Sequence, residues 1–253
     1  MSDYILQTKD LTVGYGEKVV VEQADFSVER GEIFSLIGPN GAGKTTLLKA
    51  LTHQLTPMDG NILLNGKDLN EYKPLELAQT MAVVFSDALR PDRMTCREAV
   101  AAGRYPYTGR FGTLSESDEE IIEKAMETVH IAELADRPFD AISDGQRQRV
   151  VLARALCQEP DIILLDEPTN FLDIRWRAEF LDALIALAKE EGKTVVLTIH
   201  ELELAEKISD HIVCVKGNRI DRFGTPSDIF TEDYLPTLFD MDPESFRKWF
   251  ELK

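Results

Sequence analysis

The feature that most constrains the fold of this chain is a glycine-rich run at residues 38–46. It reads GPNGAGKTT and matches the G-x-x-x-x-G-K-[ST] pattern of a phosphate-binding loop. Gly38, Gly41 and Gly43 permit tight turns in which successive backbone N–H groups point at one anion. A predicted helix from residue 44 to about residue 53 follows, and its N-terminus favours negative charge. The run therefore predicts a bound nucleoside triphosphate.

The residues around this loop support the same interpretation. The apolar run 33–37 predicts the buried strand that should precede the loop. Lys44 is placed to reach the β- and γ-phosphates, and Thr45 offers a hydroxyl to Mg²⁺. A glycine-rich turn without a ligand is the alternative, and the strand before the loop and the helix after it argue against that. We expect the nucleotide to contact Gly38, Pro39, Asn40, Gly41, Ala42, Gly43, Lys44, Thr45 and Thr46.

Composition excludes several classes of protein. With 253 residues, of which 43% are hydrophobic and 29% charged, the chain has the makeup of a globular protein with one substantial core. No run approaches the roughly 18 apolar residues of a membrane span, and the start MSDY has no signal-sequence character. Membrane-spanning work therefore falls to a partner chain. The net charge of −17 opposes nucleic acid, and we expect no nucleic-acid partner.

The cysteines predict neither disulfides nor a metal site. Cys96, Cys157 and Cys214 are odd in number, widely spaced and without a C-x-x-C pair. We expect buried thiols in a reducing compartment.

Short apolar runs separated by glycines dominate the first part of the chain. They predict strands at residues 4–6, 19–21, 25–28 and 32–37, and, beyond the loop and its helix, at 61–64 and 81–85. Asn65-Gly66 predicts a turn between the last two. This part of the chain is expected to supply an N-terminal antiparallel β subdomain.

From about residue 88 the pattern becomes helical. Helices are predicted at 97–102, 118–129 and 146–156, and we interpret this stretch as an inserted helical subdomain. Beyond it, strands at 162–165, 194–199, 211–215 and 219–223 and a helix at 174–190 predict a parallel α/β core. The chain is expected to form one α/β domain with its core at 1–87 and 157–230, the helical insertion at 88–156 and an extension at 231–253.

The C-terminal extension carries Phe246, Trp249 and Phe250 at helical spacing. We interpret them as a face packed on the core in preference to a partner site.

Two adjacent carboxylates follow the predicted strand at 162–165. Asp166 and Glu167 stand where a P-loop fold needs an acid linked to Mg²⁺ and a group that orients water. Asp166 would support the metal, and Glu167 would act as general base. Without the phosphate-binding loop upstream, the default interpretation of these two residues would be a polar turn at the end of a strand.

The order of these motifs resembles that of ABC-type ATPase domains, over about residues 4–223. The resemblance rests on Tyr15 within VGYG, the loop 38–46, ISDGQ at 142–146, Leu164 to Pro168, Leu172-Asp173 and His200. The family's signature reads LSGGQ, and ISDGQ followed by Arg147-Gln148-Arg149 is a close variant that sets this family apart from other P-loop ATPases.

The resemblance implies roles for residues that are weak signals alone. Tyr15 would stack on adenine, although by itself it would be an ordinary aromatic at a strand end. A lone histidine after a strand is usually structural, but His200 follows the strand next after the carboxylates. The resemblance makes it a γ-phosphate contact that helps hold Glu167 and water in line. Lys44, Glu167 and His200 would be the catalytic set.

The resemblance also implies that two chains enclose two ATP molecules. Ser143, Gly145 and Gln146 of the signature would contact the γ-phosphate bound to the opposite subunit. Asp173 would act across the same dimer seam.

The sequence departs from the family in two places. The usual Gln that contacts Mg²⁺ and the membrane subunit is missing, and counting back from residues 95–98 places Ser86 at that position. Asp144 stands where the signature normally has Gly. Because a carboxylate beside a γ-phosphate would be repelled, we expect Asp144 to point away from the nucleotide and to be a candidate cap for the helix beginning near Gly145.

The resemblance implies an ATP-hydrolysing subunit that uses ATP and Mg²⁺, and that powers a membrane transporter. Residues 97–100 and 103–106 look like the importers of iron chelates, haem or cobalamin. The implied partners are a second copy or a like ATPase subunit and separate permease subunits, at the cytoplasmic face of the cell membrane. The alternative is a non-transport ABC ATPase that acts on a soluble assembly such as an iron–sulfur scaffold. A regulator that does not hydrolyse is disfavoured because Lys44, Asp166, Glu167 and His200 are all present.

Overall fold

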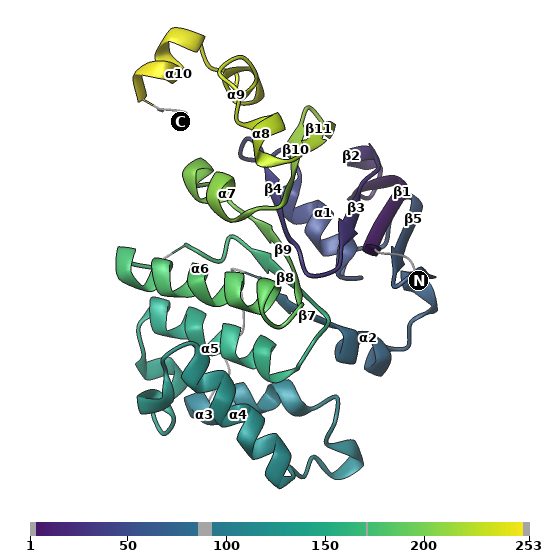
Figure 1. Ribbon diagram of the computed structural model, residues 1–253. Coiled ribbons are helices and arrows are strands. Elements are labelled where there is room, and N and C mark those ends of the chain that lie inside the picture. Colours follow the sequence, from purple (N-terminus) through teal and green to yellow (C-terminus); the bar gives the residue numbers. More distant parts are fainter. Residues whose placement is uncertain (1–3, 86–92, 171, 250–253) are drawn as a thin grey trace. The chain divides into compact units, whose positions relative to one another are not determined.

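The computed structural model describes residues 4–85, 93–170 and 172–249 (Figure 1). The chain forms two compact units. The first unit comprises residues 1–72 and 194–253, and the second unit comprises residues 73–193. The predicted helical insertion at 88–156 lies within the second unit.

The first unit contains the predicted antiparallel β region. Strand β1 (Tyr4–Tyr15) pairs antiparallel with β2 (Lys18–Ala24), β3 (Ser27–Glu29) and β5 (Asp59–Leu64), and β6 (Lys67–Asp68) pairs with β5. The strand β1 is much longer than the predicted 4–6. Asp10 has a left-handed backbone (φ 49°), and the register with β5 shifts between Lys9 and Thr12. This bulge breaks the apolar alternation on which the sequence prediction relied.

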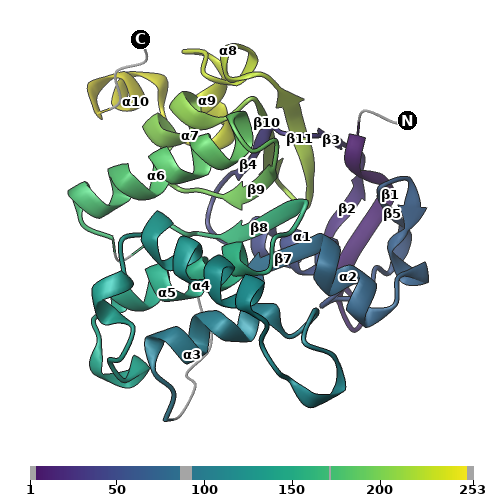
Figure 2. The same ribbon diagram turned by 60° about the horizontal axis from the view of Figure 1, so that its bottom comes forward.

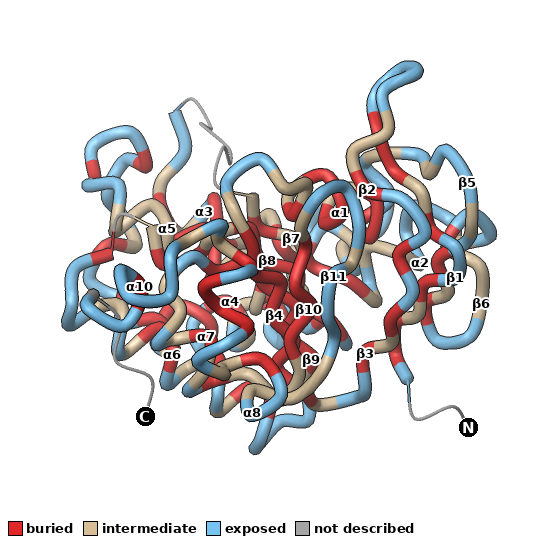
Figure 3. The backbone as a smooth tube through the Cα atoms, turned by 90° about the horizontal axis from the view of Figure 1, so that it is seen from above, coloured by how far each residue is buried: buried red, intermediate tan, exposed pale blue. Residues whose placement is uncertain are grey.

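A parallel sheet holds the centre of the first unit. Strand β4 (Ile33–Ile37) lies between β9 (Thr194–Thr198) and β10 (His211–Lys216), parallel to both, and β11 (Arg219–Gly224) closes antiparallel on β10. Every residue of β4 is buried, as an apolar run covered on both faces requires. The buried backbone of β4, β9 and β10 is red in Figure 3. The predicted parallel α/β core is confirmed.

Helices α1 (Lys44–Leu51) and α7 (Leu202–Ile208) contact this sheet. Helix α8 (Pro226–Ile229) follows β11, and the extension forms α9 (Tyr234–Leu238) and α10 (Pro243–Trp249). Helix α7 was not predicted, because a helix of about two turns offers too short an apolar pattern. Phe246 is 1% exposed, so this member of the predicted apolar face is buried. Phe250 lies outside the described residues, as does the side chain of Trp249.

The second unit is built on five helices and a parallel strand pair within its described residues. Strands β7 (Met81–Val84) and β8 (Ile162–Asp166) run parallel. The helices are α2 (Pro74–Thr80), α3 (Cys96–Ala101), α4 (Glu116–Thr128), α5 (Asp144–Cys157) and α6 (Ile174–Lys189). In Figure 2, α3, α4 and α5 lie side by side, in agreement with their mutual contacts. Single 3₁₀ turns span Leu69–Glu71 in the first unit, and Ala102–Arg104, Gly109–Phe111, Ala132–Leu134 and Phe139–Ala141 in the second.

Side-chain caps set the starts of three helices in the second unit. Thr95, Ser115 and Ser143 each accept a hydrogen bond from the backbone N–H three residues on, as N-caps of α3, α4 and α5. The helices therefore begin slightly earlier than the apolar periodicity predicted. Helix α2 was missed, although Pro74 at its first position is a helix-start signal.

A buried ion pair ties the middle of the second unit together. Arg104 is 5% exposed, and its Nε lies 2.7 Å from Asp118 Oδ1. Its Nη1 donates to Glu159 Oε2 and to the Cys157 carbonyl oxygen, both at 2.9 Å. Arg104 thereby joins the start of α4 to the end of α5. All three cysteines are buried free thiols, as the sequence predicted.

Candidate active site

The phosphate loop, residues 38–46, follows β4 and begins with a glycine that no other residue can replace without strain. Gly38 has φ 146°, and a Cβ built there would lie 2.2 Å from the Val215 carbonyl oxygen of β10. The loop therefore runs against the neighbouring strand with no room for a side chain.

The end of the loop is confined in the same way. Gly43 has φ 106°, and a Cβ would meet the side chains of Val21 and Val20 at 2.6 and 2.8 Å. Gly41 also has a left-handed backbone, at φ 79°, but a Cβ there would face open space. All three glycines singled out in the sequence thus adopt positive φ angles, as a loop of converging N–H groups needs.

Lys44 is the first residue of α1 and only 5% exposed. Its Nζ donates to the carbonyl oxygens of Gly38 at 2.9 Å and Pro39 at 3.1 Å. The ammonium is therefore held over the loop itself. Thr45 follows it in the first turn of the helix, where the positive end of the helix dipole lies.

Tyr15 and His200 also belong to the first unit. Tyr15 ends β1 and is 50% exposed, so its ring is accessible for stacking. His200 is exposed and follows β9, which pairs parallel with β4 in the register Leu36 opposite Thr198. The carboxyl ends of β4 and β9 meet at one sheet edge, so His200 and the phosphate loop follow the same edge.

The two carboxylates lie in the second unit at the end of β8. Asp166 is the last residue of the strand and is 3% exposed. Glu167 has a left-handed backbone at φ 49°, which turns the chain sharply after the strand. Such strain is typical of residues held for function. Asn170, which sequence analysis missed, donates from Nδ2 to Glu167 Oε2 at 2.6 Å and so orients this carboxylate.

The signature turn, residues 142–146, forms the start of α5. Ser143 Oγ accepts from the Gln146 N–H at 3.3 Å, and the Ser143 N–H donates to Gln146 Oε1 at 3.0 Å. This reciprocal cap leaves Gly145 in the first turn, near the positive end of the helix. Three predicted site residues thus share one helix N-terminus.

The expectation that Asp144 caps this helix is wrong. The cap is Ser143, whose extended backbone (φ −68°, ψ 161°) and hydroxyl meet the stereochemistry of an N-cap. Asp144 is the first helical residue, and its Oδ1 accepts from Arg147 Nη1 at 2.7 Å. Arg147 also donates to the Asp140 carbonyl oxygen, so it ties Asp144 back to the preceding turn.

Further contacts in the second unit join its candidate residues. Gln148 Nε2 donates to the Pro168 carbonyl oxygen at 3.0 Å, which connects α5 to the turn that carries Glu167. Asp173 caps α6, with its Oδ1 accepting from the Trp176 N–H at 3.0 Å. The adjacent Ile174 is 86% exposed. Ser86 lies outside the described residues, so its assignment as a metal ligand remains a prediction.

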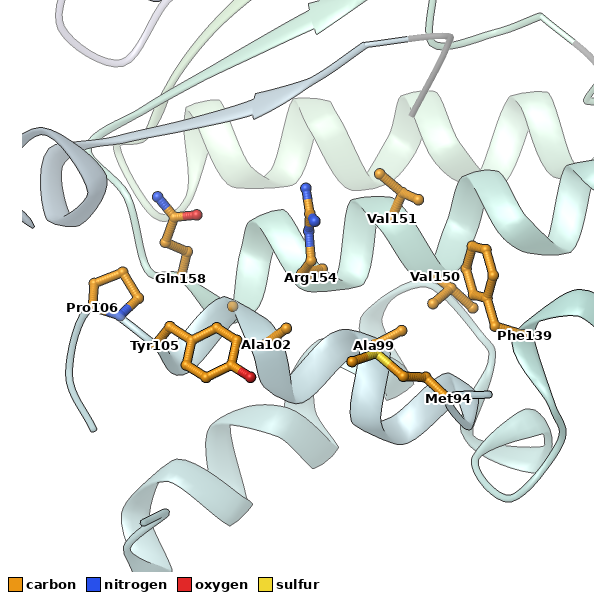
Figure 4. Close-up of a pocket in the computed structure, with 11 residues that line it drawn as sticks. Met94, Ala99, Ala102, Tyr105, Pro106, Phe139, Val150, Val151, Arg154 and Gln158 are labelled. Atoms are coloured by element: carbon orange, nitrogen blue, oxygen red, sulfur yellow. The ribbon is translucent and has the colours of Figure 1, made fainter. Parts of the chain in front are cut away.

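An apolar cavity of about 440 Å³ also opens in the second unit, between α3 and α5 (Figure 4). Its lining includes Met94, Tyr105, Phe139, Val150 and Arg154. Within the described part of the chain Arg154 makes no hydrogen bond or ion pair, and burial lowers the pKa of its guanidinium. The cavity therefore combines apolar walls with an uncompensated positive charge.

Comparison with known proteins decides the family. Residues 21–170 match the family described as ABC transporter. The iron(3+)-hydroxamate import ATP-binding protein FhuC of Bacillus subtilis (strain 168) is 39% identical over 239 residues, which cover 94% of this chain and 89% of that protein. The chain belongs to the ABC transporter ATP-binding family. As an ABC ATPase it binds and hydrolyses ATP.

Solved structures agree with this assignment. A metal-chelate type ABC transporter in an inward-facing conformation matches this ABC ATPase with a TM-score of 0.81 and 28% identity, over 94% of this chain and 89% of that one. A dimeric ATP-binding cassette bound to ADP and phosphate after hydrolysis matches with a TM-score of 0.77 and 26% identity, over 87% and 98% of the two chains. No helix among the described residues of the ABC ATPase is long and apolar enough to span a membrane.

Proposed function

We propose that this ABC ATPase powers an importer of the iron–siderophore, haem or cobalamin type, with an iron chelate as the first candidate cargo. The similarity to an iron(3+)-hydroxamate import protein over nearly the whole of both chains carries the proposal. The fold shared with a metal-chelate transporter supports it. The cargo is substrate of the permease and does not touch the ATPase.

The phosphate loop is the proposed ATP cradle. Its backbone N–H groups, turned inward by Gly38, Gly41 and Gly43, would bind the β- and γ-phosphates together with Lys44. The carbonyl contacts of Lys44 hold its ammonium at this loop. The accessible ring of Tyr15 would stack on adenine.

Glu167 is the proposed general base for the attacking water. The hydrogen bond from Asn170 Nδ2 orients the carboxylate of Glu167, and a carboxylate held in this way is suited to accept a proton from water. His200 would contact the γ-phosphate and help hold that water in line. Electrostatic positioning of this kind accounts for most of the catalysis in phosphoryl transfer to water.

The residues assigned to Mg²⁺ are chemically suited to it. Thr45 offers a hydroxyl and Asp166 a carboxylate, and oxygen ligands of this kind are those that Mg²⁺ prefers. No cluster of three or more His, Cys, Asp or Glu side chains forms a metal site in the described ranges. That pattern fits an ion held mainly by nucleotide phosphates and water. Mg²⁺ would neutralise charge on the β- and γ-phosphates.

We propose that two copies close on two ATP molecules. The N-terminal turn of α5, with Ser143, Gly145 and Gln146, would face nucleotide bound to the partner copy. Asp173 would act at the same seam. The exposure of Asp173 and of the apolar Ile174 beside it supports a partner at this turn.

The proposed permease contact is the apolar cavity of the second unit. Its apolar walls suit a partner helix with one apolar face, and Arg154 suits a carboxylate on that helix. Docking there would hold the ATPase at the inner face of the cell membrane. Any cytoplasmic protein partner in place of a permease would need the same chemistry.

Uptake by intact cells tests the function. Cells that lack this chain would be given radiolabelled ferric hydroxamate, haem or cobalamin, and then complemented with the wild type or Glu167→Gln. We expect one of the three uptake activities to be lost and to return with the wild type alone. Normal uptake of all three, with the tagged chain retained in a soluble complex, would favour the non-transport alternative.

A further inference from the structure

Two guanidinium groups lie against the ring of Trp176 in α6. The Arg149 Cζ lies 3.6 Å from the centre of the indole ring, and the Arg175 Cζ lies 5.1 Å from it. Arg149 comes from α5 and Arg175 from α6. The indole is therefore a contact between two helices of the second unit.

Arg149 is a buried cation that this contact helps to compensate, together with the carboxylates of Glu133, Glu179 and Asp173. The residue is 5% exposed, and its Nη1 donates to the His130 carbonyl oxygen at 2.8 Å. Its Nε has no hydrogen-bond partner among the residues that the structure describes. The face of an indole attracts a desolvated guanidinium strongly, so the stack offsets part of the desolvation cost.

The backbone of Trp176 also contacts the exposed turn before it. Its backbone N–H donates to Asp173 Oδ1, and Asp173 and Ile174 both project into solvent. The residue whose ring contacts Arg149 therefore also donates the backbone hydrogen bond that closes this exposed turn.

Consecutive residues of α5 hold both ends of the segment between Glu167 and Trp176. Gln148 binds the Pro168 carbonyl oxygen at one end, and Arg149 stacks on Trp176 at the other. The carboxylate turn and the Asp173 turn are thereby tied to the helix that begins with the signature.

We propose that the Arg149–Trp176 stack couples the position of the signature turn to that of the Asp173 turn, and that this coupling favours the closure of two copies of the chain on each other. Trp176 is a positioning residue in this scheme and touches no nucleotide. The inference rests on the proposed dimer. It predicts that the stack affects closure of two copies and leaves nucleotide binding by one copy intact.

The test uses Glu167→Gln as background, so that the ATP-bound dimer accumulates. Trp176→Leu removes the aromatic face while keeping a good helix former, and Trp176→Phe retains an aromatic face. Sedimentation would give the ATP-dependent dimer dissociation constant, and a fluorescent ATP analogue the affinity of the monomer. We expect dimerisation to weaken about tenfold in Trp176→Leu and less than about threefold in Trp176→Phe. ATP affinity should change by less than about twofold in both.

Ile185→Ala is the matched control, because Ile185 lies on the same helix, is 36% exposed and lies outside the stack. It should leave dimerisation unchanged. Normal dimerisation of Trp176→Leu would overturn the coupling. Equal losses of ATP affinity and dimerisation, with a lower melting temperature, would also overturn it and show a general structural role. If Glu167→Gln itself failed to dimerise with ATP, the proposed dimer would be refuted instead.

A double-mutant cycle tests the pair directly. Arg149→Lys keeps the charge and loses the planar stack, so it should weaken dimerisation, and combining it with Trp176→Leu should add little. Fully additive losses would show that the two residues act independently, which contradicts the proposal.

Discussion

The phosphate loop and the signature turn are both proposed to contact phosphate, but different interactions hold their backbones in shape. Backbone stereochemistry forms the loop, since Gly38 and Gly43 adopt positive φ angles against neighbouring strands and a Cβ would collide at either position. Side chains form the signature turn, where Ser143 and Gln146 cap α5 and Asp144 is accommodated by Arg147. The loop therefore keeps the family pattern, while the signature turn tolerates Asp in place of Gly. Stereochemical constraints allow fewer substitutions than side-chain hydrogen bonds.

The largest expected effect separates chemistry from binding. Glu167→Gln should lower ATP turnover on the order of 100-fold or more, because the amide cannot accept a proton from water. ATP affinity should stay near wild type, since the loop in the first unit is untouched. Steady-state hydrolysis and equilibrium ATP binding measure the two effects. Turnover above about a tenth of the wild-type rate would remove Glu167 from the role of general base.

Gly38→Ala is the sharpest test of the stereochemical loop. Because the new Cβ would lie 2.2 Å from the Val215 carbonyl oxygen, the loop or β10 must shift. We expect a loss of about 2–4 kcal/mol in ATP binding or stability. Gly41→Ala is the control, because its Cβ faces open space and adds backbone strain alone. Calorimetric ATP titration should show a smaller loss for Gly41→Ala, and equal losses would contradict the role of the close approach.

A pH-dependent effect is expected in the second unit and involves Asp118. Hydrogen bonds from Ser115 and then Arg104 lower the pKa of its carboxyl from 3.8 to about 2. A lowered carboxyl pKa stabilises the fold above the ordinary value, and this contribution is lost as the pH falls through about 2. In urea titrations at neutral and acidic pH, Asp118→Asn should show a lower free energy of unfolding than the wild type near neutrality and a weaker pH dependence at acidic pH. Identical pH profiles would exclude this linkage.

Ser143→Ala tests whether side chains hold the signature turn. Loss of the cap should cost about 1 kcal/mol of stability and weaken ATP-dependent dimerisation in the Glu167→Gln background. Ser143→Thr retains a capping hydroxyl and should behave like the wild type. If Ser143→Ala dimerised normally, the turn would not depend on its cap.

The smallest effect is expected at Asp144. Its carboxylate pairs with Arg147, so Asp144→Gly should change ATP-dependent dimerisation by less than about threefold. Sedimentation in the Glu167→Gln background would measure it. Dimerisation at least tenfold tighter, or about 1.4 kcal/mol, would show that the carboxylate faces phosphate.

The sequence by itself determined the local parts of this protein. The phosphate loop, the strand before it, the helix after it and the carboxylates at the end of β8 were all predicted, because each depends on neighbouring residues in the chain. The apolar periodicity of α4, α5 and α6 likewise gave their positions to within a few residues. Short helices such as α2 and α7 were missed, because a turn or two offers too few apolar repeats.

Tertiary structure decided what depends on residues far apart in the chain. Gly38 is irreplaceable because of Val215 in a distant strand, a contact that no local pattern records. Strand β1 continues through the bulge at Asp10, because it pairs with β5 on both sides of the bulge even though the apolar alternation is interrupted there. The stack of Arg149 on Trp176 and the bond from Gln148 to Pro168 exist only because α5 packs beside α6 and the carboxylate turn. Packing between distant segments selects such contacts, whereas sequence patterns report only periodicity and local stereochemistry.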